Sequence, residues 1–153
     1  MAGISATEQL FDHLVRSETR LYNAVGERLK AAHGIVASQF EFLRYLGEHP
    51  RSRVADLAAN FAVGIGATSK GVDRLETRGW VRRAPNPDDR RSSLLELTPS
   101  GQELVEIAGE TYREQLAVLL GSAIGEAQVD ALLPVFAALR EGLERRNAGL
   151  PAG

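Results

Sequence analysis

The stretch that decides the fold is VADLAANFAVGIGATSKGVDRLETRGWVRRAPNPDDRRSSLLELTPSG, residues 54–101. Its first part has apolar side chains at helical spacing up to Phe61. A turn marked by Gly64 and Gly66 follows, and then a second amphipathic segment that ends at Gly79. A short helix, a tight turn and a second helix make a helix-turn-helix, which the sequence therefore predicts here.

The spacing of the apolar residues changes from a helical to a strand-like period after the second helix. Residues 80–84 and 93–97 read as two short strands, because apolar and β-branched residues cluster there between turn residues. The Pro-Asn-Pro-Asp-Asp run at 85–89 is typical of a turn. We expect a β-hairpin directly after the helix-turn-helix, which is the wing of a winged helix.

Outside this stretch the chain reads as helices. Residues 6–31 and 126–146 carry broad apolar stripes at helical spacing. Ser38 and Ser100 each have a glutamate three positions on, the spacing of a capping box, so we expect them to cap two further helices. The predicted fold class is mainly α: a winged helix-turn-helix with a small β-hairpin wing and long N- and C-terminal helices.

Composition excludes several classes of protein. The 153 residues are 44% hydrophobic and 25% charged, as in a folded domain or two small units that share a core. No cysteine is present, so disulfides and thiolate metal sites are excluded. Residues 1–5 do not resemble a signal peptide, and no apolar run has the length of a membrane span. We expect a cytoplasmic protein that does not contact membranes.

Basic charge is concentrated in the middle of the chain. The net charge is −2, yet residues 51–91 hold nine basic and five acidic side chains, a net charge of +4. The ends are therefore acidic. A basic patch attracts the phosphate backbone of nucleic acid, although a solvated charged face is also mixed in sign.

The second helix of the motif, residues 66–78, has two different faces. With Val72 at the centre of the buried face, Ile65, Thr68 and Leu75 fall near it. Small and basic residues fall on the opposite face, which could approach base edges or be merely solvated. The candidate DNA contacts, including the wing tip and the start of the preceding helix, are Arg51, Ser52, Arg53, Gly66, Ala67, Ser69, Lys70, Arg74, Arg90 and Arg91.

Two carboxylates on this surface need an explanation, because they repel phosphate. We expect Asp73 to orient a wing arginine, either Arg90 or Arg91. We expect Asp89 to position the same arginines at the tip, where they suit a narrow minor groove. The alternative is an ordinary exposed charged turn.

These features together resemble the MarR-type (multiple antibiotic resistance regulator) winged helix-turn-helix family. The resemblance rests on Val-Ala-Asp-Leu-Ala at 54–58, Val-Asp-Arg-Leu-Glu at 72–76 with Gly-Trp-Val at 79–81, and Asp-Arg-Arg at 89–91 with Leu-Thr at 97–98. The resemblance implies a homodimer whose first and last helices interlock. It also implies binding to palindromic double-stranded DNA, usually as a repressor, and relief by a small, often aromatic or phenolic, ligand.

The resemblance divides the chain into functional parts. It implies an N-terminal dimerisation helix at 1–34, a DNA-binding lobe at 35–100 and C-terminal dimerisation helices at 101–146. The sequence itself indicates a disordered tail at 147–153. The apolar stripes of the terminal helices support the dimer, since no other large partner is available to cover them. The alternative is that these helices pack on each other within one chain.

The effector pocket has no readable motif. Candidate lining residues are His13, His33, Tyr45 and Tyr112, although each type is common in cores and on surfaces. The histidines show no metal-ligand spacing, so no metal is expected. The run Gly64-Ile65-Gly66-Ala67-Thr68-Ser69 lacks the third glycine of a dinucleotide fingerprint and follows a helix.

The sequence therefore predicts a transcription regulator rather than an enzyme, with no cofactor. Arginine outnumbers lysine sixteen to two, which is typical of a GC-rich bacterial genome. The alternative function is a winged helix that binds proteins and has no sequence-specific affinity for DNA.

Overall fold

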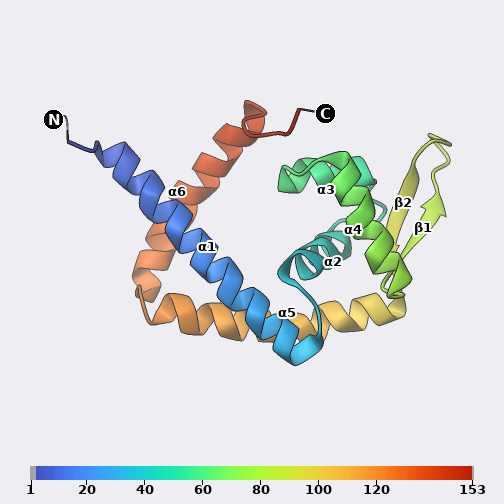
Figure 1. Cartoon of the computed structure of the whole chain (residues 1–153), viewed down its shortest axis with the longest axis horizontal. Coiled ribbons are helices and arrows are strands. Elements are labelled where there is room, and N and C mark those ends of the chain that lie inside the picture. Colours follow the sequence, from blue (N-terminus) through green and yellow to red (C-terminus); the bar gives the residue numbers. More distant parts are fainter. Residues whose placement is uncertain (1–2, 153) are drawn as a thin grey trace.

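The computed structural model describes residues 3–152, and Figure 1 shows a chain built mostly of helices. In chain order the elements are α1 (Ala6–His33), α2 (Ala37–Glu48), α3 (Val54–Phe61), α4 (Ile65–Thr77), β1 (Val81–Pro85), β2 (Ser93–Leu97), α5 (Pro99–Gly121) and α6 (Glu126–Arg145). This is the predicted order, and most boundaries differ from the prediction by only one or two residues. The fold class is confirmed as mainly α with one hairpin.

Helices α2, α3 and α4 and the hairpin form a compact lobe around one core. Leu43 of α2, Leu57 of α3 and Leu75 of α4 are fully buried and belong to the same cluster. The short helices fold against the lobe because each buries one apolar stripe there. The lobe lies on the right in Figure 1, with the hairpin at its outer edge.

The hairpin is antiparallel and in regular register, with Val81 opposite Leu97 and Pro85 opposite Ser93. A short third segment extends it, since Ser52 forms an isolated bridge with Leu95. The backbone N–H of Leu95 donates to the carbonyl of Ser52 at 2.7 Å. The start of α3 is thereby attached to the wing.

Helix α5 joins the lobe to the terminal helices along the bottom of Figure 1. The C-terminal part of α1 packs against the lobe and α5, where Val25 and Leu29 are buried. The N-terminal part of α1 rises away from the lobe, whereas α6 runs back up toward α3 (Figure 1), and its C-terminal half lines a cavity together with α2 and α3. No residue of α6, all of which the structure describes, is buried.

Both predicted capping boxes are wrong. Helix α2 begins after Val36, whose N–H donates to the Gln39 side chain at 3.2 Å, so Ser38 already lies inside the helix. Helix α5 begins after Thr98, whose hydroxyl accepts from the N–H of Gly101 at 3.1 Å. Proline at the first helical position fits this start, because its missing N–H would have no partner there.

Ile65 also differs from the prediction. It lies 59% exposed at the first position of α4, although its helical angle places it near the buried stripe. Within α4 the stripe is therefore buried only from Thr68 onward. Within residues 3–152, no single helix is both long and apolar enough to cross a membrane; α5 and α6 meet the length and composition test only together, across a bend of 107°.

Candidate nucleic-acid interface

The outward face of α4 has the predicted composition. Thr68, Val72 and Leu75 are buried, and the Thr68 hydroxyl donates to the carbonyl of Gly64 at 2.9 Å. Four predicted contact residues, Gly66, Ala67, Lys70 and Arg74, are exposed, whereas Ser69 is half-buried. The structure therefore presents one face of α4 with small residues at its start and two cations further along.

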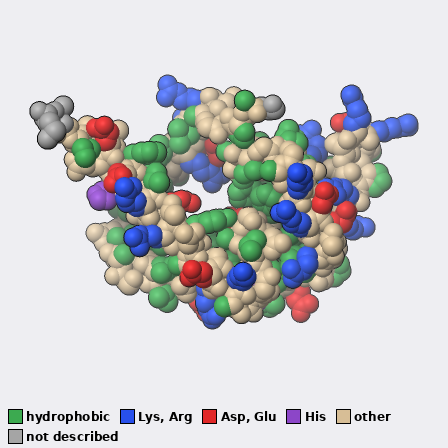
Figure 2. Space-filling model, viewed as in Figure 1, with side chains coloured by type: hydrophobic (Ala, Val, Ile, Leu, Met, Phe, Trp, Pro, Cys, Tyr) green, Lys and Arg blue, Asp and Glu red, His purple; other side chains and the backbone are tan. Residues whose placement is uncertain are grey.

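The two cations of this face keep their donors available. Within residues 3–152, neither Lys70 nor Arg74 forms an ion pair with a carboxylate. Figure 2 shows Lys and Arg side chains gathered over the lobe and at the end of the hairpin. Cations without a protein partner can bind phosphates or guanine edges without first breaking an ion pair.

Asp73 does orient the wing, but through a different arginine from the one predicted. The guanidinium of Arg83 lies 2.8 Å from Asp73 and 3.0 Å from Glu76, so one β1 side chain joins two α4 carboxylates. Arg83 alternates with the outward-facing Arg82 along β1 and is only 25% exposed. The prediction that Asp73 holds Arg90 or Arg91 is wrong in this respect, and the strand is fastened rather than the tip.

The wing tip is organised by its own short side chains. Asp89 accepts hydrogen bonds from the N–H of Arg91 at 2.9 Å and from the hydroxyl of Ser92 at 3.3 Å. Asn86 accepts from the N–H of Asp88 at 3.0 Å and donates to the Ser92 hydroxyl. Arg91 stays 97% exposed. The tip is therefore a turn held by hydrogen bonds to Asp89 and Asn86 that leaves Arg91 exposed to solvent.

The start of α3 fits the prediction only in part. Ser52 is 8% exposed and donates to the carbonyl of His49 at 2.7 Å, so its side chain is structural and the prediction that it contacts DNA is wrong. Arg53 forms a two-point pair with Asp56 at 3.1 and 2.9 Å. These bonds hold the pKa of Asp56 below its ordinary value. Arg51 is more available, since its closest carboxylate, on Glu96, lies 3.7 Å away.

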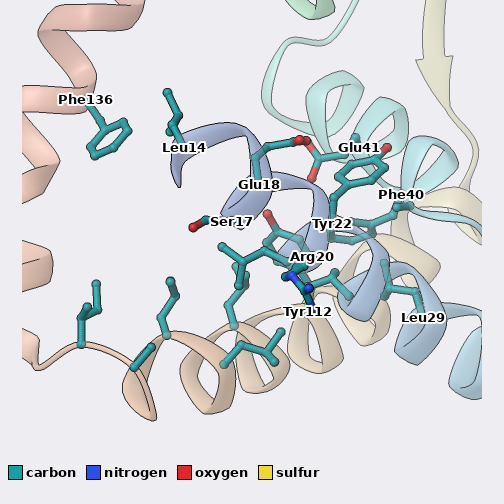
Figure 3. A pocket seen from close by; sticks show the side chains of 18 of the residues that line it. Leu14, Ser17, Glu18, Arg20, Tyr22, Leu29, Phe40, Glu41, Tyr112 and Phe136 are labelled. Atoms are coloured by element: carbon teal, nitrogen blue, oxygen red, sulfur yellow. The ribbon is translucent and has the colours of Figure 1, made fainter. Parts of the chain in front are cut away.

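An apolar cavity of about 650 Å³ lies between α1, α2, α5 and α6 (Figure 3). Of the four predicted lining residues, only Tyr112 reaches it. His13 is exposed on α1, and His33 forms a hydrogen bond with the Thr111 hydroxyl at 2.7 Å. Tyr45 stacks on His49 with ring centroids 4.2 Å apart, and both line a separate cavity between α2, α3 and α6. His13, His33 and Tyr45 therefore do not line this cavity, whose walls are the apolar faces of the helices with Glu18, Tyr22 and Glu41.

Comparison with known proteins decides the family. The family model described as MarR family matches residues 35–93, from the start of α2 to the start of β2. The multiple antibiotic resistance protein MarR of Salmonella typhimurium is 30% identical over 109 residues, which are 67% of this chain and 76% of that protein. The chain belongs to the MarR family.

Further relatives agree with this assignment. The HTH-type transcriptional repressor NicR of Pseudomonas putida is 33% identical over 117 residues, 76% of this chain and 73% of that protein. A MarR family transcriptional regulator from Streptomyces coelicolor, solved in complex with DNA, superposes with a TM-score of 0.84 at 27% identity, covering 99% of this chain and 96% of that one. The protein is a MarR family transcriptional regulator with the winged-helix fold, not an enzyme.

Two wing residues of this MarR family regulator were missed at the sequence level. Arg82 pairs with Glu96, directly opposite on β2, and Arg83 pairs with α4. The strand register would have shown the first pair, since opposite residues of an antiparallel ladder are neighbours. Period-two alternation along a strand also places Arg82 and Arg83 on different faces of the hairpin.

Proposed function

We propose that this regulator binds a palindromic operator as a homodimer and represses transcription until a small effector binds. The observation that carries the proposal is the outward face of α4, whose two cations have no carboxylate partner in residues 3–152 and lie beside an ordered wing. The Streptomyces coelicolor relative in complex with DNA supports the DNA-binding part.

In this proposal α4 lies in a major groove. Lys70 and Arg74 contact base edges or phosphates, while Gly66, Ala67 and Ser69 allow close approach. Arg90 and Arg91 reach the adjacent backbone or minor groove from the wing tip. Arg51 contacts a phosphate beside α3. Arg53 can do so only if its hydrogen bonds to the Asp56 carboxylate break.

The dimer is supported by the apolar side chains that no other part of the described chain covers. Leu133 and Val135 of α6 are 67% and 61% exposed, and Leu10 and Phe11 of α1 are 65% and 66% exposed. Figure 2 shows hydrophobic side chains along the hollow between α1 and the lobe. A second copy that covers these faces would bury them, and the hydrophobic effect would then stabilise the dimer.

The proposed division of the chain follows from this dimer. Residues 1–34 and 101–146 supply dimerisation helices and residues 35–100 the DNA-binding lobe. The tail at 147–153, whose last residue lies outside the described part of the chain, is proposed to be disordered. We also propose a cytoplasmic location, where the protein would meet its operator.

Repression and its relief are the finer part of the proposal. NicR is described as a repressor, which supports that sign of regulation. The cavity lies against both the terminal helices and α2 of the lobe. An effector bound there would contact both parts, so its binding would be coupled to the spacing of the two DNA-binding lobes.

A fluorescence-anisotropy titration of the full chain against labelled DNA from upstream of its own gene tests this function. We expect saturable binding to one site, with an affinity that falls steeply as salt rises, because each neutralised phosphate releases a counterion. Weak binding to every sequence, with no salt dependence, would contradict it and favour a winged helix that contacts proteins instead.

A further inference from the structure

The first residue of α4 carries an apolar side chain that the protein itself leaves uncovered. Of the large apolar side chains in the lobe, residues 35–100, Ile65 is the most exposed, at 59%. Val72 lies within roughly 20° of it round the helix and is fully buried, so the exposure of Ile65 comes from its place at the end of α4. Burial of an apolar side chain is favourable, and Ile65 therefore gains from a partner outside the chain.

The residues next to Ile65 leave it free to project. Helix α4 begins after Gly64, and a Cβ added at Gly64 or Gly66 would meet nothing within 4 Å. Ala67 adds only a methyl group. In an α-helix the Cα–Cβ bonds tilt toward the N-terminus, so the Ile65 side chain extends past the first turn of α4. It is the large side chain that lies furthest forward on this helix.

Ile65 lies on the flank of α4 that faces the wing. Asp73 and Glu76, which pair with Arg83 of β1, lie roughly 80° and 20° round the helix from it. In Figure 1 α4 runs from α3 to the base of the hairpin, so its first turn and the wing tip lie at the same end of the lobe. Lys70 leaves α4 roughly 140° away from Ile65. Ile65 is therefore at the wing-side margin of the face that we propose enters the major groove.

The second copy of the proposed dimer does not account for this exposed side chain. Ile65 lines neither the cavity between α1, α2, α5 and α6 nor the cavity between α2, α3 and α6. The apolar side chains that a second copy would cover belong to α1 and α6, such as Phe11 and Leu133. The partner of Ile65 is therefore expected on the side of the lobe that meets DNA.

The base edges in the major groove offer one apolar group. Guanine, cytosine and adenine present hydrogen-bond donors and acceptors there, whereas thymine presents a C5-methyl group beside its O4 acceptor. An isoleucine side chain has no group that could pair with a polar edge, so it would leave a donor or acceptor without a partner. Against the methyl group of thymine it buries apolar surface on both molecules.

We propose that Ile65 is a specificity-determining residue of the operator complex and packs on the C5-methyl group of one thymine in each half-site. The inference rests on the proposed DNA-binding function and deepens it, because it assigns one base to one side chain. Lys70 and Arg74 hold α4 in the groove through their charge, and Ile65 adds discrimination without charge. Its position on the wing-side flank places this thymine at the end of the α4 contact nearest the wing tip.

Operator DNA in which single thymines are replaced by deoxyuridine tests this contact, because uracil lacks only the C5-methyl group. The operator located by anisotropy is synthesised with the thymines of one half-site replaced one at a time. We expect one position at which the replacement weakens binding of the full chain about fourfold, the value of one buried methyl group. The contact neutralises no phosphate, so the ratio of the two affinities should not change with salt.

Ile65→Ala should remove the preference for thymine at this position and leave the effect of the other thymines unchanged. The variant should fold, because the side chain is exposed and alanine favours the helix, and thermal unfolding checks this. Val63→Ala is the matched control. Val63 is an exposed apolar residue two positions earlier, and it lines the cavity that Tyr22 of α1 borders, so it does not face the wing. This control should retain the preference.

A thymine preference that is lost in Ile65→Ala and kept in Val63→Ala supports the assignment. Equal binding of all the deoxyuridine operators by the unmodified chain, a preference that survives in Ile65→Ala, or its loss in both variants would each overturn it. The unsubstituted operator scores the proposed function separately. Specific, salt-dependent binding with no effect of uracil would refute this inference alone, whereas a chain without a specific site would refute both.

Discussion

Among the glycines that the structure describes, Gly101 leaves the least room for a side chain. A Cβ at this position would overlap the carbonyl oxygen of Trp80, which itself accepts a hydrogen bond from the N–H of Thr98 at 3.0 Å. The Thr98 hydroxyl donates in turn to the carbonyl of Gly79 at 2.6 Å. The end of α4, the start of the wing and the start of α5 therefore meet where only glycine fits.

Gly101→Ala should destabilise the protein, because the methyl group meets backbone that cannot rotate away. We expect a loss of about 1–3 kcal/mol in the free energy of unfolding, measured by urea denaturation. The matched control is Gly66→Ala, also near a helix start, where a Cβ meets nothing within 4 Å. Equal stability of the two variants would show that the contact is not as tight as described.

Asp73→Asn should loosen the wing without unfolding the lobe, since it removes one of the two charges on Arg83. We expect faster amide hydrogen exchange at residues 81–97 and a loss of roughly 0.5–1 kcal/mol in DNA binding, as for a partly exposed ion pair. Asp12→Asn, which removes a surface charge from the Asp12–Arg16 pair of α1, is the control. Unchanged exchange in the wing would mean that Asp73 does not position it.

Single-residue roles were the hardest to predict from the sequence. Asp73 was correctly expected to orient a wing arginine, yet its partner depends on which face of β1 turns toward α4. Ser52 was predicted to contact phosphate and proves buried, because its backbone pairs with β2. Both errors come from tertiary contacts that no local pattern reveals.

At the scale of elements, we propose that α4 contacts the bases and that the wing contacts the DNA without regard to sequence. Lys70→Ala or Arg74→Ala should cost about 1–3 kcal/mol of DNA binding if the side chain contacts a base, and should relax specificity at one position. Arg91→Ala should weaken binding to all sequences alike. Competition titrations with single-base operator variants distinguish these effects, and uniform losses for all three variants would mean that none of them contacts a base.

The elements themselves were predictable, since periodicity and breakers act locally. The spacing of apolar residues changes at Gly79 and again at Thr98, and these two positions separate α4, the hairpin and α5 in the structure as well. Helix caps were less predictable, because Thr98 and Ser100 both have capping side chains and the choice depends on Pro99. The apolar cavity between α1, α2, α5 and α6 was largely unpredictable, since its walls come from helices that are far apart in the chain.

At the scale of the whole molecule, the proposed dimer depends on the apolar face of α6. Leu139→Glu should place a charge in the centre of this face and dissociate the dimer, because an unpaired carboxylate is costly to bury. Ala137→Glu, two positions away and therefore roughly 200° round the helix from Leu139, should leave it intact. Light scattering coupled to size-exclusion chromatography reports the mass, and a monomeric unmodified chain would contradict the proposed assembly.

The most direct test of the account measures how many chains bind one operator, and with what spacing. Footprinting and anisotropy with the upstream DNA should show one dimer per site, with half-sites about one helical turn, roughly 10 base pairs, apart. An isolated half-site should bind far more weakly, and binding should weaken steeply with salt. A single chain that binds one half-site as tightly as the full palindrome would contradict the account.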